Sequence, residues 1–311
     1  MQPEIDAYFK DVAARYRISQ HVRLRSVVEA AAWDSSTGTW TVTIRDLNTG
    51  EIRHRRCKAL VSAVGALSVP KKCDIPGASA FGGKMFHTAE WDHSFDWEGK
   101  EVVVIGNGCS ATQAVPVMSD GPNAAKRITQ FSRQAHWLSD RPNPEYSGLF
   151  KWTMRWVPFV MRTYRAWLYW SMEKDFQGFD IETGAEIRSG WSKTAEDYIR
   201  TNAPAKYREF LVPKTEIGCK RRVNDTDYLA CLHRDNVELV YDDAIQEIVQ
   251  SGVRTKSGRV VDADAIVLAH GFETQKLLAP MEIFGEDGVS ITEHVSILCS
   301  LGHQKLLLCV C

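Results

Sequence analysis

The sequence predicts an α/β protein with one Rossmann-like domain, a helical insertion and a second domain. Its 311 residues are enough for two domains of about 100–200 residues each. A buried-strand pattern at 101–105 runs directly into a glycine-rich turn and a helical pattern. A second strand pattern, Arg127–Ser132, follows and completes a βαβ unit.

The segment before this unit predicts one helix and three strands. Apolar side chains recur at helical spacing at Ile5, Tyr8, Phe9, Val12 and Tyr16. Two runs of strand type follow, Val22–Trp33 and Thr39–Leu47, and the turn-forming residues 35–38 join them. The almost wholly apolar run Ala59–Val64 predicts a buried strand. Residues 66–100 are rich in Pro, Gly and aromatic residues, which is typical of a connection between domains.

The segment after the βαβ unit predicts helices first and strands later. Residues 141–210 have the pattern of a mainly helical insertion. Strand patterns return at Val237–Tyr241, Gln246–Val253 and Ala265–Ala269, with a turn at Gly258. We therefore expect domain boundaries that give 1–97, 98–272 and 273–311.

Composition excludes several classes of protein. Lys and Arg number 38 against 39 Asp and Glu, so the chain lacks the basic field expected of a nucleic-acid-binding protein. The eight cysteines include no CxxC pair, which argues against common zinc sites and dithiol redox motifs. No metal site is expected. The cysteine usage and an N-terminus without a signal-peptide pattern predict a cytoplasmic location.

An aromatic stretch at 149–172 could be mistaken for a membrane span. It is interrupted by Pro158 and by four cations: Lys151, Arg155, Arg162 and Arg165. Each cation would cost about 2.5–3.5 kcal/mol at the centre of a bilayer. We expect an aromatic helical segment that covers a pocket or packs on a neighbour, with association at a membrane surface as the alternative.

The glycine-rich turn predicts a dinucleotide site. Gly106 allows a tight turn, Gly108 lets the backbone approach a pyrophosphate, and Ala111 permits close packing of helix on strand. Unpaired N–H groups at the helix start bind the anion. The residues expected at this site are Gly106, Asn107, Gly108, Cys109, Ser110, Ala111, Thr112 and Gln113. The alternative is a turn between strand and helix that holds no ligand.

The end of the second strand favours NADPH over NADH. NAD-binding folds place Asp or Glu there to hold the ribose 2′-hydroxyl, whereas this chain has Ser132 and Arg133. A guanidinium and a hydroxyl suit a 2′-phosphate. An ordinary surface arginine at position 133 is the competing interpretation.

Just before the nucleotide fold, residues 81–92 have the sequence FGGKMFHTAEWD. This stretch matches FxGxxxHxxxW[P/D] and resembles the fingerprint of Baeyer–Villiger monooxygenases, a family of class B flavoprotein monooxygenases. The matching residues are Phe81, Gly83, His87, Trp91 and Asp92. The resemblance implies a hinge between domains, whereas His87 taken alone would be an ordinary loop histidine.

Further segments resemble the family up to about His294, and the resemblance assigns roles to three of their residues. Arg221 would be the active-site arginine, Lys220 a nicotinamide-cofactor contact, and Val28 an adenine-side flavin contact. By pattern alone, residues 220–222 would be a solvated basic cluster. The other matching segments are Gln2–Ile5, Leu67–Pro70, Ile75–Gly77, Leu211–Lys214, Gly218–Arg221, Asp235–Val237 and Ala269–Phe272, where His270 replaces the threonine of the family.

The resemblance implies two dinucleotide-binding domains, the cofactors FAD and NADPH, and insertion of an oxygen atom from O2 next to a ketone carbonyl. Oxygenation of sulfur or nitrogen is the alternative within the same chemistry. The substrate would be a small-molecule ketone. The tryptophans at 152, 156, 167 and 170 could line a pocket for a bulky secondary-metabolite ketone. Alternatively, they pack helices together. A disulfide reductase, which shares the architecture, is excluded because it needs a CxxC dithiol.

Two departures put the activity of the chain in doubt. No glycine-rich turn follows a strand in the first hundred residues, so the resemblance implies an incomplete FAD domain. The tail from Val295 resembles no part of the family. We therefore expect a truncated gene product, and the competing function is a catalytically inactive NADP-binding fragment.

Overall fold

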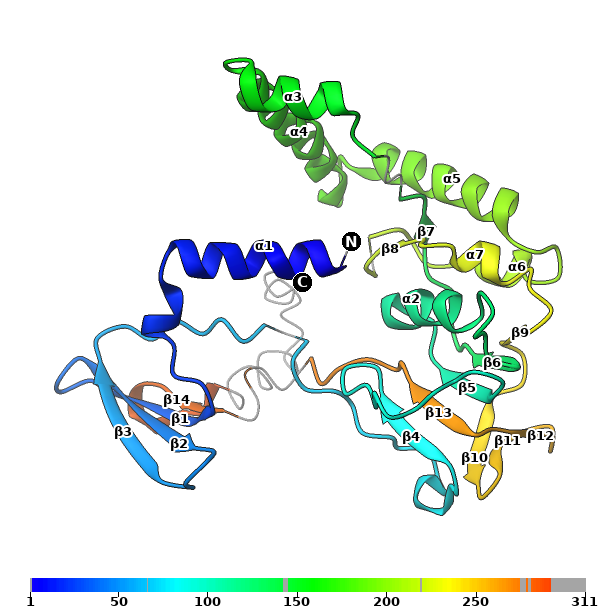
Figure 1. The fold of residues 1–311 in the computed structure, drawn as a ribbon, viewed down its shortest axis with the longest axis horizontal. Coiled ribbons are helices and arrows are strands. Elements are labelled where there is room, and N and C mark those ends of the chain that lie inside the picture. Colours follow the sequence, from blue (N-terminus) through cyan, green and yellow to red (C-terminus); the bar gives the residue numbers. More distant parts are fainter. Residues whose placement is uncertain are drawn as a thin grey trace. The chain divides into compact units, whose positions relative to one another are not determined.

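A computed structural model describes residues 2–65, 67–141, 145–218, 220–274, 278 and 281–291 (Figure 1). The chain forms two compact units. Unit 1 combines residues 1–70 with 272–311, and unit 2 is formed by residues 71–271. The tail from Val295 lies outside the described residues.

Unit 1 contains a four-stranded sheet with the order β14-β1-β2-β3. Its strands are β1 (Ser26–Asp34), β2 (Thr39–Asp46), β3 (Ile52–Cys57) and β14 (Glu282–Phe284). The first three form an antiparallel meander, and β14 pairs in parallel with β1. Segments from both ends of the chain therefore build this sheet, around a small core of Ala31, Val42, Met281 and Ile283.

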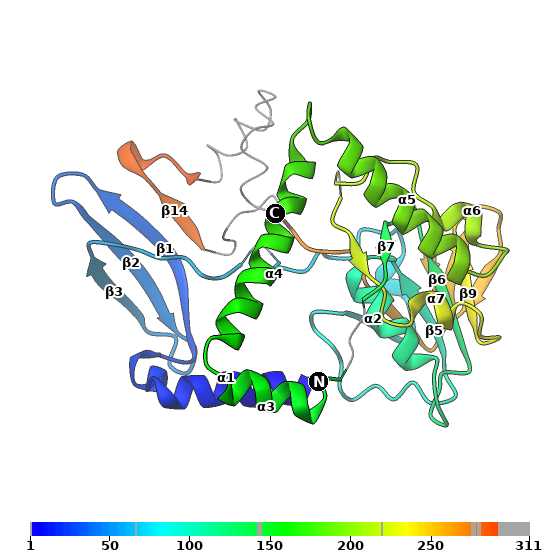
Figure 2. The ribbon, with the colours of Figure 1, turned by 90° about the horizontal axis from the view of Figure 1, so that it is seen from above.

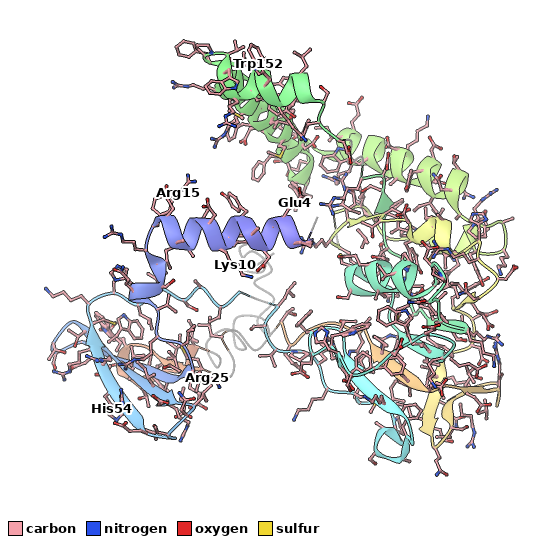
Figure 3. The ribbon with its side chains drawn as sticks, in the orientation of Figure 1. Glu4, Lys10, Arg15, Arg25, His54 and Trp152 are labelled. Atoms are coloured by element: carbon pink, nitrogen blue, oxygen red, sulfur yellow. The ribbon has the colours of Figure 1, made fainter. Side chains whose placement is uncertain are left out.

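Helix α1 (Gln2–Arg15) precedes this sheet, with the 3-10 turn η1 (Ile18–His21) between them. The helix exposes Tyr8 and Phe9, and it carries ion pairs one turn apart, such as the one between Lys10 and Asp6 (Figure 3). Each such exposed pair stabilises the helix by about 0.2–0.5 kcal/mol. The predicted first helix is confirmed.

Two strand predictions in unit 1 were wrong. The first strand begins at Ser26, not at Val22. The predicted strand Ala59–Val64 forms no strand, and Val61 is 85% exposed. A buried strand needs neighbours on both sides and cover on both faces, and the described part of unit 1 supplies neither at this segment. The third strand of the meander is instead Ile52–Cys57, whose arginines suit an exposed edge.

Unit 2 is built on a five-stranded parallel sheet with the order β4-β13-β5-β6-β9. Its strands are β4 (Lys84–His87), β5 (Glu101–Ile105), β6 (Arg127–Phe131), β9 (Val237–Val240) and β13 (Ala265–Leu268). The middle of β5 and all of β13 are buried, because helices pack on one face of the sheet and an antiparallel sheet within residues 245–262 packs on the other. Helix α2 (Cys109–Met118) connects β5 to β6, as the sequence predicts.

The pairing of β4 with β13 moves the domain boundary. We expected residues 66–100 to connect two domains and the second domain to begin at residue 98. The structure places residues 71–97 in unit 2, because β4 forms the edge strand of its parallel sheet. The short strand was not expected, since its sequence, KMFH, has no clear alternation.

Two smaller sheets complete unit 2. The antiparallel meander consists of β10 (Ile245–Val249), β11 (Gly252–Thr255) and β12 (Val260–Asp262). The predicted single strand Gln246–Val253 is therefore two strands with a tight turn at 250–251. The second sheet is the parallel pair β7 (Leu138–Ser139) and β8 (Val223–Asn224).

The predicted helical insertion is present. It consists of α3 (Gly148–Trp156), α4 (Val160–Phe176), the 3-10 turn η3 (Gln177–Phe179), α5 (Ala185–Asn202) and α6 (Arg208–Leu211), and the short helix α7 (Tyr228–Cys231) follows. Helix α5 packs on the core through Ala195 and Ile199. Helices α3 and α4 meet at a sharp turn (Figure 2), and neither helix contains a fully buried residue.

The aromatic residues of the insertion lie on its surface. The tryptophans at positions 152, 156, 167 and 170 are each more than half exposed, and Trp152 is labelled on α3 in Figure 3. Contacts between the two helices run instead through Phe150 and Tyr164, whose ring centroids lie 5.6 Å apart. The predicted lining of a pocket by the tryptophans thus stays a prediction. No helix in the described part of the chain is long and apolar enough to cross a membrane.

Candidate functional site

The glycine-rich turn joins the end of β5 to the start of α2. Gly106 has a φ of +116°, and its N–H donates to the carbonyl of Phe131 at 2.9 Å. A Cβ at this position would lie 2.3 Å from the carbonyl oxygen of Ala269, at the end of β13. Both the dihedral angle and the close approach exclude a side chain, so the fold itself requires glycine here.

Gly108 has a different reason to be glycine. Its φ of −75° is open to any residue, and a Cβ there would meet nothing within 4 Å. It is the N-cap of α2, and no side chain caps that helix. The first N–H groups of the helix are therefore left for an acceptor from outside, which is how helix N-termini bind phosphates.

The next residues of the motif divide into two kinds. Ala111 is fully buried and lets α2 pack closely on the sheet. Thr112 and Gln113 both donate to the carbonyl of Cys109, at 3.2 and 2.8 Å, so their side chains brace the first turn of the helix. Cys109 and Ser110 are partly exposed at the helix start.

Two buried side chains that sequence analysis did not single out, Gln130 and Tyr228, hold the glycine-rich turn in place. Gln130, near the end of β6, is fully buried and donates from Nε2 to the carbonyl of Gly106 at 2.8 Å. Its Oε1 accepts from the hydroxyl of Tyr228 at 2.9 Å. Burial strongly raises the pKa of Tyr228, so the phenol stays protonated and donates. The sequence of β6, RITQF, gave no signal for this role, because Arg127 and Thr129 are polar as well.

The loop after β6 lies beside the turn. Asn107 is buried, and its Nδ2 donates to the main-chain carbonyl of Gln134 at 2.7 Å. The hydroxyl of Ser132 donates to the same carbonyl at 3.3 Å. Both bonds hold the carbonyl of Gln134 and so restrain the loop that carries Arg133. The Arg133 side chain is exposed and has no ion pair with another described residue, so its charge is available to a ligand.

Lys220 comes to this loop from a distant part of the chain. The pairing of β7 with β8 places residues 223–225 along residues 137–139, and Nε1 of Trp137 donates to the carbonyl of Thr215 at 3.0 Å. The ammonium group of Lys220 donates to Oε1 of Gln134. The structure therefore brings Lys220 together with the loop that carries Arg133. Arg221 is exposed and unpaired among the described residues, while Cys219 lies outside them.

The fingerprint histidine bridges β4 and the end of unit 2. His87 is buried, and its Nδ1 accepts the N–H of Ala89 at 3.0 Å. Its Nε2 therefore carries the proton and donates to the carbonyl of Gly271 at 3.0 Å. Gly271 is the last residue of unit 2, so this bond ties the sheet to the point where the chain returns to unit 1.

The other fingerprint residues pack or form hydrogen bonds around β4. A Cβ at Gly83 would lie 2.4 Å from the carbonyl oxygen of Asp264 and would also overlap the ring of Phe81. Trp91 packs edge-on against Phe86, with ring centroids 5.1 Å apart. Asp92 accepts from Lys84 at 2.8 Å, and this hydrogen bond is the main cause that lowers its pKa to about 2.

Comparison with known proteins identifies the family. The family described as flavin-binding monooxygenase-like matches residues 2–177. The chain belongs to this family. It is 31% identical to the FAD-binding monooxygenase ktnD of Aspergillus niger, covering 94% of this chain and 48% of the relative. It is 32% identical to a Baeyer–Villiger monooxygenase of Streptomyces coelicolor, covering 94% and 54%.

Solved structures of flavin monooxygenases have the same fold. A structure of OTEMO with FAD and NADP matches with a TM-score of 0.78 at 25% identity, covering 94% of this chain and 61% of that one. An oxidized steroid monooxygenase bound to NADP matches at 0.77 and 27%, covering 96% and 62%. The predicted fold class and the resemblance to Baeyer–Villiger monooxygenases are thus confirmed. The chain spans about half the length of the curated relatives it matches.

The two cofactors expected in a flavin monooxygenase do not fit the described residues equally. Unit 2 offers the glycine cradle and uncapped helix of a dinucleotide site. Among the described residues of unit 1, no strand leads into a glycine-rich turn and an α-helix. Val28 lies on β1 and packs against the small core of unit 1, so its contact with flavin stays a prediction.

Two histidines of unit 2, His136 in the loop after β6 and His270 beside His87, are held in environments that disfavour their charge. Burial, followed by the charge of Lys220, lowers the pKa of His136. Burial, followed by His87, lowers the pKa of His270, whose ring lies 5.5 Å from that of His87. Both ring nitrogens of His270 are buried without a hydrogen-bond partner among the described residues. Each histidine is therefore easier to protonate in the unfolded chain.

Acidification should consequently weaken unit 2. The contribution of the two histidines to stability is complete above the unfolded value of 6.5 and is lost as the pH falls through their lowered folded-state pKa values. We expect the urea midpoint, followed by tryptophan fluorescence, to fall between about pH 7.5 and about pH 5.5. His270→Thr should flatten this dependence. A midpoint that rises on acidification would contradict the argument.

Proposed function

We propose that unit 2 binds NADPH and that the chain carries the nicotinamide-nucleotide part of a Baeyer–Villiger-type flavin monooxygenase. The observation that supports this most directly is the cradle at the start of α2. A side chain at Gly108 would fit the fold, so glycine there leaves open space in front of the first turn of α2. No side chain caps the N-terminus of that helix. A pyrophosphate group would fill that space and accept the N–H groups of the first helical turn.

The charged groups beside the cradle support NADPH over NADH. Arg133 lies in the loop after β6, Lys220 reaches the same loop through its bond to Gln134, and Ser132 adds a hydroxyl there. No carboxylate occupies the end of β6, where an NAD site would hold the ribose hydroxyls. We assign the 2′-phosphate to Arg133 and Lys220, which would bind it through charge-assisted hydrogen bonds.

Arg221 is proposed as the active-site cation of the whole enzyme. A guanidinium keeps its charge at every accessible pH, which suits it to holding an anionic oxygen group. In the described residues its side chain is exposed and without an ion pair, so no carboxylate neutralises it. NADPH, when bound, supplies a hydride, and the residues of unit 2 orient it without taking part in that transfer.

For the substrate, we propose a bulky apolar ketone, with an oxygen atom from O2 inserted next to its carbonyl. Two observations support this choice. One similar structure is that of a steroid monooxygenase. The helical insertion offers four exposed tryptophans, a surface that suits a large apolar molecule better than a small polar one.

Arg133→Ala tests the cofactor assignment. Loss of a charge-assisted contact to the 2′-phosphate should weaken NADP⁺ binding by about 1.5–3 kcal/mol, roughly tenfold to a hundredfold, and leave NAD⁺ binding unchanged. Isothermal titration of the purified chain with both nucleotides measures this directly. Arg254→Ala, an exposed arginine on β11, serves as the matched control. Equal losses of both nucleotides in Arg133→Ala would remove the role in 2′-phosphate binding.

The second candidate function is an NADP-binding chain that does not oxidise NADPH. The described residues of unit 1 favour it, because they lack a cradle for the FAD pyrophosphate. The visible absorbance spectrum of the chain, after incubation with FAD and removal of free flavin, separates the two functions. Bound flavin in near-stoichiometric amount supports the monooxygenase, and a colourless protein that still binds NADPH supports the fragment.

A further inference from the structure

We propose that Gln134 is a positioning residue, which holds Lys220 beside Arg133 and thereby sets the preference for NADPH over NADH. This inference rests on the proposed binding of NADPH by unit 2. Gln134 lies between two parts of the candidate site that are far apart in sequence. It is bonded to the glycine-rich turn through its main chain and to Lys220 through its side chain.

The main chain of Gln134 is fixed by the turn itself. Its carbonyl accepts from Nδ2 of the buried Asn107 at 2.7 Å and from the hydroxyl of Ser132 at 3.3 Å. These two donors come from the loop after β5 and from the end of β6. The backbone from which the Gln134 side chain projects is therefore held by residues next to the cradle.

Lys220 needs such a partner because only its main chain is otherwise held. The flanking segment is docked by the bond from Trp137 to Thr215 and by the N–H of Val223, which donates to the carbonyl of Trp137 at 2.8 Å. A lysine side chain has four flexible bonds, and fixing it costs rotamer entropy. The hydrogen bond to Oε1 of Gln134 restrains the ammonium group before a ligand arrives, which lowers the cost of binding.

The neutral carboxamide is essential to this role. Oε1 of Gln134 accepts from the ammonium group without cancelling its charge, so Lys220 still attracts a phosphate. A carboxylate at the same position would neutralise Lys220 and repel the 2′-phosphate. It would instead offer the acceptor that NAD-binding folds use for the ribose hydroxyls. Gln134 thus acts through Lys220, and Gln134→Glu is expected to reverse the preference.

The test is isothermal titration of the full chain with NADP⁺ and NAD⁺. Gln134→Ala should weaken NADP⁺ about threefold to tenfold and leave NAD⁺ unchanged. Gln134→Glu should weaken NADP⁺ at least tenfold and keep or improve NAD⁺ binding. In a Lys220→Ala background, Gln134→Ala should have no further effect, because the residue to be positioned is gone. Gln246→Ala, an exposed glutamine on β10, is the matched control.

Three outcomes would overturn the inference. The first is an unchanged ratio of the two affinities in Gln134→Ala. The second is an equal effect of Gln134→Ala with and without Lys220, which would mean that the two side chains act independently. The third is an equal loss of both nucleotides together with a lower melting temperature, as a general structural role would produce. Failure of the proposed function would look different, because the wild-type chain itself would then show no preference for NADP⁺ over NAD⁺. That result would overturn both proposals.

Discussion

Gly106→Ala should lower the melting temperature of unit 2 more than any other single alanine substitution in the turn. A non-glycine residue at a φ of +116° costs about 1–3 kcal/mol. The new methyl group would also lie 2.3 Å from the carbonyl oxygen of Ala269. That atom belongs to the backbone directly after the interior strand β13, so it cannot move aside without disturbing the sheet.

The size of the fall in melting temperature follows from the strained dihedral angle and the close contact with Ala269 together. We expect a loss of about 3 kcal/mol or more, which corresponds to a fall of roughly 6–12 °C for a unit of this size. Differential scanning fluorimetry measures it. Gly258→Ala is the matched control, since Gly258 also has a positive φ of +89° but would meet nothing within 4 Å. Equal shifts in the two variants would show that the contact with Ala269 carries no energy.

The part of the fold that the sequence predicted well is the part that local signals encode. The limits of β5 and the end of α2 agree with the prediction, because an apolar run, a glycine turn and a helical pattern follow one another without interruption. The prediction failed where the partner of a segment decides its structure. Ala59–Val64 has the composition of a buried strand but no neighbouring strand in the described residues, whereas the arginine-rich Ile52–Cys57 pairs with β2.

The candidate site shows the same division. Gly106, Gly108 and Arg133 lie within one local motif, and their positions could be predicted from it. The hydrogen bond between Tyr228 and Gln130 joins residues 98 positions apart, and no local pattern announces it. Lys220 differs from both. The local run of charges at 220–222 favours a solvated basic cluster, and only the resemblance to the family indicated that Lys220 contacts a cofactor.

Gly108→Ala should produce the opposite result from Gly106→Ala, leaving the fold intact and removing nucleotide binding. A φ of −75° is comfortable for alanine, and the added methyl group meets no protein atom within 4 Å. The change of N-cap residue costs about 1 kcal/mol or less. The melting temperature should therefore move by no more than about 4 °C.

The methyl group of Gly108→Ala would, however, stand where a pyrophosphate must approach the first N–H groups of α2. Because NADP⁺ and NAD⁺ share the pyrophosphate, both affinities should fall together, by about 3 kcal/mol or roughly a hundredfold. This common loss separates the cradle from Arg133, whose substitution should affect NADP⁺ alone. The same titration measures both. If Gly108→Ala bound either nucleotide as tightly as the wild type, the nucleotide could not lie on this turn, and the reason for glycine at a position that the fold leaves free would have to be sought elsewhere.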